Sequence, residues 1–300
     1  SFTLDGKGNI SLAFFRRGRH RKIPITPCRL ADRALNRAAS YITSWVNEFK
    51  VPVRSLKSLI LRANEKGEVI AGLFIKDKVS IIQHPRLQSP LTGFHIFFST
   101  PRTPASRPDQ CLHTNGAGEL SSSIHGTRLH YGLFSFFQIN RRPFLRVLDD
   151  ITPFLDPGKP LVDFYSGVGA LSIPLHNCYT RCTAVEISHE AVGYARHNSS
   201  INHLENYTVH EASTEKALEF ITSESFILFD PPRSGLHKKI IQKLIETKPL
   251  RIIYLSCNIS TQARDLALVQ EHYSASFLKL YNFFPRTPHM EALCVLDRIQ

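Results

Sequence analysis

The sequence predicts an α/β protein in which a mostly parallel sheet, with helices on both faces, follows a smaller α+β domain. From about residue 160 onward, apolar strand-like runs alternate with helix-like segments, and such alternation requires right-handed crossovers between parallel strands. Residues 1–133 instead contain short strand-like runs broken by Gly and Pro. Because 300 residues with 42% hydrophobic content exceed the usual size of one domain, we expect two domains, 1–133 and 134–300.

The expected elements of the second domain follow one another in a regular order. Strands are predicted by the apolar runs LVDFY, CTAVE, NYTVHE, FILFD and IIYLSC. Helices are expected at four places: at the end of GVGALSIPLH, after a cap at Ser188, near 213–222 and near 236–247. Two further strand patterns, SFLKLYNFF and EALCVLDR, have no helix between them. An antiparallel pair should therefore close the sheet.

The first domain has a strong positive charge. Residues 1–133 contain 20 Lys plus Arg against 8 Asp plus Glu, whereas residues 134–300 contain 17 of each, so the net charge of +12 belongs to the first part. Strand runs VIAGLFI and FHIFFS and a helix near 30–49 are expected there. Basic surface of this kind attracts RNA phosphates, and it would also attract anionic lipid.

The segment FFRRGRHRK is the densest part of this basic surface. Arg16, Arg17 and Arg19 stand beside Phe14 and Phe15, and aromatic rings next to guanidinium groups suit unpaired nucleic acid, in which bases stack while phosphates pair. A solvated basic loop is the alternative. We predict that these arginines contact RNA because the charge excess extends over the whole domain.

No apolar run approaches the roughly 18 residues that cross a bilayer, and no signal peptide is recognisable. We therefore predict a cytoplasmic, monomeric protein without a membrane partner. The six cysteines lack the density of a secreted disulfide framework and should be reduced. Cys178 and Cys182, with His176, resemble half of a metal site, but no second pair completes four ligands, so we predict an ordinary loop and no metal.

Residues at the carboxyl ends of the parallel strands should converge on one crevice, where open sheets bind ligands; they are Asp163 to Gly169, Glu186, Asp230 and Cys257. The turn Gly167-Val168-Gly169 resembles a nucleotide-binding loop, but Ser172 replaces the third glycine of the dinucleotide motif. Glu186 ends the next strand, where a carboxylate can accept hydrogen bonds from ribose hydroxyls. These features favour S-adenosylmethionine over a pyrophosphate cofactor, with a tight turn that binds no ligand as the alternative.

Two further strand ends carry residues that could bind a ligand or take part in a reaction. Asp230 precedes two prolines and should face the crevice, because a carboxylate is costly to bury unpaired. Arg233 follows those prolines and suits a phosphate or a base carbonyl. Cys257 lies at a strand end beside a helix start, where the helix dipole favours a thiolate; a buried structural role, as we expect for Cys294, is the alternative. A thiolate beside a methyl donor can attack carbon 6 of a pyrimidine and activate carbon 5.

The chain at this point resembles the S-adenosylmethionine-dependent RNA uridine-5-methyltransferases, which make 5-methyluridine in tRNA and 23S rRNA. Six motifs in the family's order carry the resemblance: FFQIN, DFYSGVGALSIPL, VEIS, DPPRSGL, SCNISTQARD and FFPRTPHMEALCVL. The resemblance implies a Rossmann-like class I methyltransferase domain, preceded by a domain that is more loosely similar to the family's central RNA-binding domain.

The resemblance also implies residue roles. Cys257 is the nucleophile and Glu291 the base that removes the carbon 5 proton, while Arg233 helps to hold the uridine. The cofactor contacts are Gln138, Tyr165, the Gly167 loop, Ala170, Glu186 and Asp230. Many family members have Asn at the position of Ala170 and Cys at that of Ser166. Some carry a four-cysteine iron–sulfur site or an N-terminal β-barrel; the sequence shows neither, and Cys28 alone cannot hold a cluster.

Two other functions remain open at this point. The first is an RNA-binding or RNA-remodelling protein with a vestigial methyltransferase domain, which would bind RNA without S-adenosylmethionine. The second is methylation of carbon 5 of cytosine, which is disfavoured because the Asp-Pro-Pro-Arg motif lacks the second cysteine that such RNA enzymes usually carry.

Overall fold

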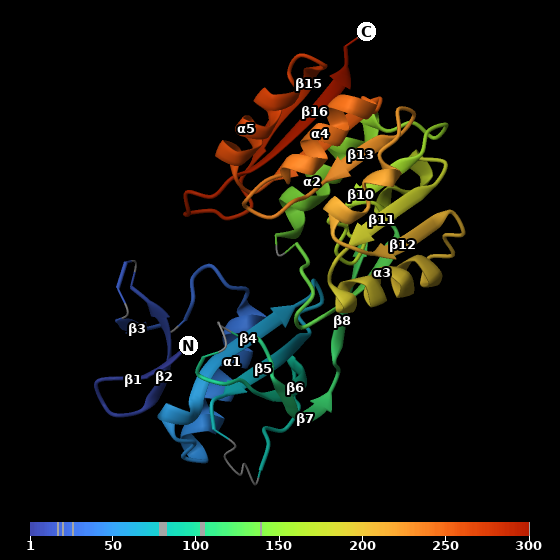
Figure 1. Ribbon diagram of the computed structural model, residues 1–300. Helices are drawn as coiled ribbons and strands as arrows, with labels where there is room; N and C mark the ends of the chain where they lie inside the picture. Colours follow the sequence, from blue (N-terminus) through green and yellow to red (C-terminus); the bar gives the residue numbers. More distant parts are fainter. Residues whose placement is uncertain are drawn as a thin grey trace. The chain divides into compact units, whose positions relative to one another are not determined.

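The computed structural model describes residues 1–16, 18–19, 21–25, 27–77, 83–102, 106–138 and 140–299. The chain forms two compact units, Ser1–Ser122 and Ser123–Gln300 (Figure 1). The sequence places the boundary further along, between residues 133 and 134. The intervening segment packs on the second unit, since the backbone N–H groups of Arg128 and His130 donate to Asn202 and Asn198 at 3.0 and 2.7 Å.

The first unit combines two small sheets and one long helix. A three-stranded antiparallel sheet consists of β1 (Phe2–Leu4), β2 (Ile10–Phe15) and β3 (Lys22–Pro24). A four-stranded mixed sheet has the order β4 (Leu56–Ala63), β5 (Val69–Ile75), β6 (Leu91–Phe98) and β7 (Gln110–Gly116). A 3₁₀ turn, η1 (Val53–Ser55), precedes β4. The two strand predictions in this unit, VIAGLFI and FHIFFS, are thus confirmed as β5 and β6.

Helix α1 (Arg33–Glu48) confirms the helix expected near 30–49. It begins at Asp32, whose side chain accepts a hydrogen bond from the backbone N–H of Ala34 at 2.7 Å. The buried face recurs at helical spacing and packs against the four-stranded sheet; its residues are Ala34, Ala38, Ile42, Trp45 and Val46. The opposite face of α1 does not pack against the four-stranded sheet and can make other contacts.

The second unit is built on a seven-stranded sheet with the order β12-β11-β10-β13-β14-β16-β15. Its five parallel strands are β10 (Leu161–Phe164), β11 (Cys182–Glu186), β12 (Tyr207–Glu211), β13 (Phe226–Phe229) and β14 (Arg251–Ser256). The predicted antiparallel closing pair is confirmed as β15 (Tyr273–Tyr281) and β16 (Glu291–Arg298). A two-stranded ribbon, β8 (Glu119–Ile124) and β9 (Thr127–Gly132), joins the two units along the chain.

The helices of this unit are α2 (Arg141–Ile151), α3 (His189–Ile201), α4 (Lys238–Thr247) and α5 (Ile259–Val269), with a 3₁₀ turn η2 (Thr152–Phe154) after α2. Ser188 caps α3 as predicted, because its side chain accepts from the N–H of Ala191 at 3.4 Å. The apolar residues between the sheet and α4 form one continuous core.

Two expected α-helices are 3₁₀ turns instead. The segment after the glycine loop is η3 (Ile173–Cys178), in which Leu175 departs from helical geometry and Pro174 has no N–H to donate. The segment near 213–222 consists of η4 (Thr214–Lys216) and η5 (Leu218–Phe220). Ala217 lies between them at φ −127°, outside the helical region, so the two turns do not merge.

Candidate active site

The glycine loop after β10 is joined directly to the end of β11. The N–H of Gly167 donates to one carboxylate oxygen of Glu186 at 3.0 Å, and the N–H of Ser188 donates to the other at 2.7 Å. Gly169 has a φ of +82°, and an added Cβ would meet the side chain of Ile173 at 2.4 Å. Only glycine fits this turn. The predicted pair of Gly167 and Glu186 is therefore brought together at the strand ends.

Beneath this loop lies the buried carboxylate of Asp163, the first of the predicted strand-end residues. Asp163 in β10 is fully buried and accepts a hydrogen bond from the Ser172 hydroxyl through Oδ2, while Oδ1 has no partner among the described residues. Burial and the charge of Glu186, opposed by the Ser172 hydrogen bond, together raise its pKa to about 7. The Ser166 hydroxyl is likewise buried without a described partner. Unsatisfied polar atoms of this kind indicate a place for a polar ligand.

Cys257 and Glu291 meet at one end of the pair formed by β14 and β16. The last residues in register are Ser256 and Ala292. Cys257 follows Ser256 and Glu291 precedes Ala292, so both residues lie at the same end of this antiparallel pair, and the charge of Glu291 acts on the Cys257 thiol. Gln262 of α5 ties the two strands together here, because its side-chain amide donates to the carbonyls of Tyr254 and Ala292 at 2.9 and 3.1 Å.

The charges around Cys257 act against a thiolate. Burial raises the pKa of Cys257, the charges of Glu291 and Asp230 raise it further, and only the Arg233 guanidinium and a backbone hydrogen bond lower it. The expectation that the dipole of α5 favours a thiolate is therefore wrong for the protein alone. Two carboxylates and desolvation outweigh a helix terminus, whose effect is small and local.

Glu291 itself is suited to proton transfer near neutral pH. It is 4% exposed, and burial raises its pKa to about 7 despite the nearby Arg233. The pKa of Asp230 is also raised well above its usual range, by burial first and then by the charges of Glu291 and Asp163. The carboxyl groups of three strand ends thus interact electrostatically, as the predicted convergence on one crevice requires.

The turn that carries Arg233 is fixed to the start of α5. Asn258 caps α5 through its side-chain oxygen, which accepts from the N–H of Ser260 at 3.2 Å, and its amide donates to the carbonyl of Arg233 at 2.9 Å. The guanidinium of Arg233 donates to Nδ1 of His289 at 2.9 Å. The backbone of Arg233 is thus held from the Cys257 turn, while its side chain is held from the segment that precedes Glu291.

A second contact between this turn and α5 lies about two helical turns after Asn258. Asp265 is buried and accepts hydrogen bonds from the N–H of Leu236 at 2.8 Å and from the Tyr254 hydroxyl at 2.9 Å. Gly235 has a φ of +77°, and a Cβ there would meet Asp265 at 2.5 Å. The motif DPPRSGL is therefore anchored at Arg233 and at Leu236 to the helix that follows Cys257.

The remaining predicted site residues have simpler environments. Tyr165 is half-buried at φ 62° next to the glycine loop, and Ala170 offers only a methyl group. Gln138 is buried, and the carbonyl of Phe136, two residues before it, lies 3.9 Å from the Cβ position of Gly167. Arg16 and Arg19 are exposed in the first unit. Arg17 lies outside the described residues.

Sequence reasoning missed several residues that position the site: Asn258, Gln262, Asp265 and His289. Asn258, Gln262 and Asp265 belong to the motif that follows Cys257. Asn258 is of the residue type that caps helices, and for Gln262 and Asp265 a polar residue on the buried side of a short helix is the signal that could have found them. The six cysteines are free, and Cys294 is buried as expected. Among the described residues, no group of three or more His, Cys, Asp or Glu could hold a metal, and none of the helices is long and apolar enough to cross a membrane.

The strand order and the strand-end site define a Rossmann-like class I methyltransferase. Residues 122–299, more than half of the chain, match the tRNA (Uracil-5-)-methyltransferase family, and the chain belongs to that family. An uncharacterized RNA methyltransferase from Prochlorococcus marinus is 36% identical over 320 residues, with 98% of this chain and 75% of the relative covered. Another from Caldanaerobacter subterraneus is 25% identical, with 99% and 71% covered.

A solved structure supports the same fold. The tRNA (uracil-54, C5)-methyltransferase of Pyrococcus abyssi, in complex with S-adenosyl-L-homocysteine, superposes with a TM-score of 0.84 at 23% identity. The match covers 97% of this chain and 73% of that one. The predicted fold class and family are thus confirmed.

Proposed function

We propose that this protein transfers a methyl group from S-adenosylmethionine to carbon 5 of a uridine in tRNA or 23S rRNA. One observation carries the proposal: Cys257 and Glu291 lie at the same end of the β14–β16 pair, where the charges of Glu291, Asp230 and Arg233 act on the Cys257 thiol and the charge of Arg233 acts on Glu291. A thiol nucleophile beside a carboxylate base is the pair that methylation of a pyrimidine carbon requires. Family membership supports the same reaction.

The residues present fit S-adenosylmethionine. Glu186 is held by two backbone N–H groups at 3.0 and 2.7 Å, so its carboxylate is oriented for ribose hydroxyls. The unpaired Oδ1 of Asp163 and hydroxyl of Ser166 offer further polar contacts below the glycine loop. Gln138, Tyr165 and Asp230 would complete the set. When bound, this cofactor supplies an electrophilic methyl group.

The protein's own residues then handle the uridine and the protons. Arg233 holds the uridine, and the Cys257 sulfur forms a bond to carbon 6, which leaves carbon 5 electron-rich. After carbon 5 is methylated, Glu291 removes its proton, the electron pair re-forms the double bond between carbons 5 and 6, and the sulfur leaves. A base with a pKa of about 7 works efficiently at neutral pH.

The raised pKa of Cys257 sets a condition on the first step. Because burial and then the charges of Glu291 and Asp230 raise the pKa of Cys257, the thiol must pass its proton to water as the uridine binds, before the sulfur forms its bond to carbon 6. Arg233 is the cation that lowers the pKa of both Cys257 and Glu291. We infer that the uridine and Arg233 together create the nucleophile in the bound state, so that the thiol of the free protein is protected from oxidation.

The basic first unit is the proposed RNA-binding part. Residues 1–122 contain 19 Lys plus Arg against 8 Asp plus Glu, so this unit carries +11 of the net charge of +12, and exposed aromatic residues stand beside the arginines, with Phe14 and Phe15 at 57% and 58% exposure. The target uridine must leave its stack to reach a strand-end crevice, so loops and weakly paired regions are the expected substrates.

The test is direct detection of the product. The full chain is incubated with S-adenosylmethionine and separate transcripts of tRNA and 23S rRNA, and nucleosides are analysed by mass spectrometry for 5-methyluridine. We expect product with the wild type and with Cys111→Ala, an exposed cysteine of the first unit, but none with Cys257→Ala. 5-Methylcytidine in place of 5-methyluridine would contradict the proposal, as would RNA binding without any cofactor binding.

A further inference from the structure

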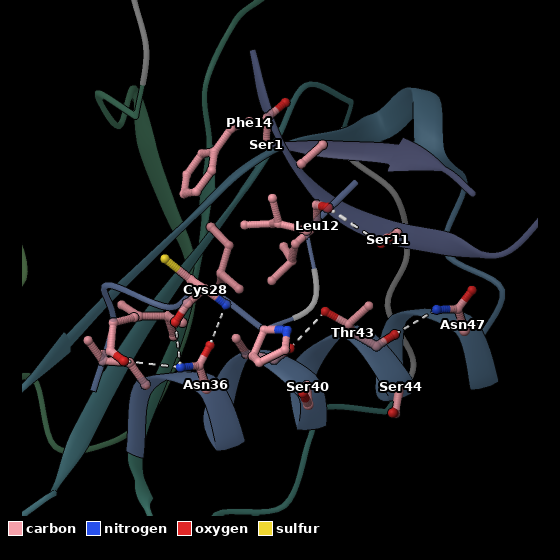
Figure 2. A pocket seen from close by; sticks show the side chains of 18 residues that line it. Ser1, Ser11, Leu12, Phe14, Cys28, Asn36, Ser40, Thr43, Ser44 and Asn47 are labelled. Atoms are coloured by element: carbon pink, nitrogen blue, oxygen red, sulfur yellow. Dashed lines mark hydrogen bonds between the residues drawn. The ribbon is translucent and has the colours of Figure 1, made fainter. Parts of the chain in front are cut away.

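A pocket of about 410 Å³ lies in the first unit (Figure 2). The residues that line it are distant in sequence from Cys257, Glu291 and the other residues proposed to act in methyl transfer. It is bounded by β2 on one side, by α1 on the other and by the segment around Cys28. Ligand pockets in proteins span roughly 300–1,000 Å³. The pocket is therefore large enough for a small ring system and too small for an extended chain.

Two asparagine side chains of α1 hold the walls of the pocket in place by hydrogen bonds. Asn36 of α1 accepts from the N–H of Cys28 at 2.9 Å and donates to its carbonyl at 3.0 Å. Asn47 makes the same two-way contact with Ile10, with both hydrogen bonds at 2.8 Å. These two amides hold the strand and the Cys28 segment against the helix at opposite ends, so the space between them persists as a fixed feature of the fold.

The lining has the chemistry of a neutral, flat ligand. None of its 18 residues has a charged side chain. Ser1 is one of the lining residues, and burial, together with the charge of Lys22, lowers the pKa of its α-amino group, which favours the neutral amine. The floor is apolar, with Leu12, Leu35 and Leu61 among its residues. Ser40 and Ser44, one turn apart on α1, have hydroxyl groups without a hydrogen-bond partner among the described residues.

The surroundings of the pocket, unlike its lining, carry positive charge. Phe14 lines the pocket and is 57% exposed. Arg33 and Arg37 are exposed on α1, three residues before the pocket-lining Asn36 and Ser40, and therefore adjacent to them on the helix surface. A recess without charged side chains, lined by the Phe14 ring and bordered by Arg33 and Arg37, matches a nucleotide whose base is buried and whose phosphate stays outside.

From these observations we propose that the pocket binds one unpaired nucleobase of the RNA substrate, distinct from the uridine that is methylated. This inference rests on the proposed function, because it takes the bound polymer to be RNA. The base enters between β2 and α1 and stacks on Phe14, and Ser40 and Ser44 reach its polar edge. The pocket thereby fixes the register of the RNA on the first unit.

The test uses RNA stem–loops in which each loop nucleotide in turn is made abasic, with binding to the full chain measured at constant salt. Stacking and burial of one base predict a loss of about tenfold at one position. In Ala39→Phe, which fills the pocket from α1, the same abasic change should cost less than about twofold. Gln110→Phe, which adds the same ring on an exposed position of β7 outside the pocket, should behave as the wild type.

Cys28 supplies a readout that needs no substitution. It lines the pocket and is half-buried, so the intact stem–loop should slow its alkylation at least about fivefold, whereas the abasic RNA identified above should protect it far less; stacking of one base accounts for an effect of this size. The exposed Cys111 serves as an internal reference in the same sample. If Ala39→Phe fails to fold, Ser44→Phe fills the pocket from an exposed position.

The outcomes separate the two proposals. The base pocket is overturned if every abasic RNA binds with the same affinity, or if abasic substitution weakens binding equally in the wild type and in the pocket-filling variants. If a protein segment occupies the pocket instead, abasic substitution again has no position-specific effect, and Cys28 stays reactive in the presence of RNA. Formation of 5-methyluridine by the wild type on the same stem–loops reports separately on the proposed function.

Discussion

Cys257 and Glu291 lie at the same end of the antiparallel β14–β16 pair: Cys257 directly follows Ser256, the partner of Ala292, and Glu291 directly precedes Ala292. The proposed nucleophile and the proposed base therefore come from the ends of two strands that are adjacent in the sheet but separated in sequence by α5 and β15. Cys257 follows the last residue of β14 and Glu291 is the first residue of β16, so each can be replaced without a substitution in the middle of a strand.

Replacing Glu291 by Gln should trap the enzyme on its RNA. The Cys257 bond to carbon 6 can form and carbon 5 can be methylated, but without the base the proton on carbon 5 stays and the sulfur cannot leave. We expect a covalent complex that survives denaturing electrophoresis and requires S-adenosylmethionine. It should vanish in the Cys257→Ala, Glu291→Gln double variant. A folded Gln variant that turns over without any trapped complex would show that Glu291 is not the essential base.

Glu186→Ala should weaken cofactor binding by at least about tenfold while leaving RNA affinity nearly unchanged. The substitution removes a carboxylate oriented by two backbone N–H groups, and charge-assisted hydrogen bonds to such a group are worth about 1.5–3 kcal/mol. Calorimetry with S-adenosylhomocysteine measures the effect. Glu205→Ala, at an exposed position after α3, is the matched control, and unchanged affinity in Glu186→Ala would contradict the assignment.

The reactivity of the Cys257 thiol should respond to its two charged neighbours in opposite directions. Glu291→Gln removes a charge that raises the pKa of Cys257, so the pKa should fall; Arg233→Gln removes a charge that lowers it, so the pKa should rise. The pH dependence of alkylation, followed at the Cys257 peptide by mass spectrometry, gives both values, with Cys111 as the internal reference. Shifts in the same direction in both variants would mean that the surrounding charges do not control the thiol.

The ionisation of Glu291 should also cost the folded protein stability as the pH rises. Its folded pKa of about 7 lies above the ordinary value of 4.5, so the folded state holds this proton more tightly than the unfolded state does. The advantage is complete below about pH 4.5 and is lost by the time the pH has passed 7. Glu291→Gln lacks this titration, so its stability relative to the wild type should increase over that range, by on the order of 3 kcal/mol.

Urea denaturation at a series of pH values measures this difference. Glu205→Gln, an exposed carboxylate, should show no comparable trend. A stability gap between Glu291→Gln and wild type that does not change with pH would contradict a raised pKa at Glu291.

The sequence predicted the second unit in detail because its strands are short apolar runs bounded by turn residues. LVDFY, CTAVE and FILFD lie where expected, and two strand patterns without a helix between them correctly predicted the antiparallel pair. The segment near 213–222 has helical composition, but Ala217 breaks it into two 3₁₀ turns, and such a local backbone choice depends on tertiary contacts that periodicity does not encode.

The electrostatics of the site could not be read from the sequence. A cysteine before a helix start suggests a lowered pKa when only local structure is considered. The outcome was reversed by burial first and then by the charges of Glu291 and Asp230, which act only once the sheet is assembled. The sequence placed Asp163 at a strand end but gave it no role of its own, since a fully buried carboxylate with one oxygen that lacks a described partner looks like any strand residue until the packing around it is known.

The fastening of the DPPRSGL turn to α5 through Asn258 and Asp265 has a consequence for how the molecule fluctuates. Because one helix anchors both the turn with Arg233 and the turn with Cys257, a local opening of α5 releases the two together. Hydrogen exchange should show the amides of Leu236 and of α5 opening as one cooperative unit; independent rates for the two segments would contradict this. In the proposed mechanism, the Cys257 thiol and Arg233, the residue proposed to hold the uridine, therefore become accessible and are withdrawn together rather than one at a time.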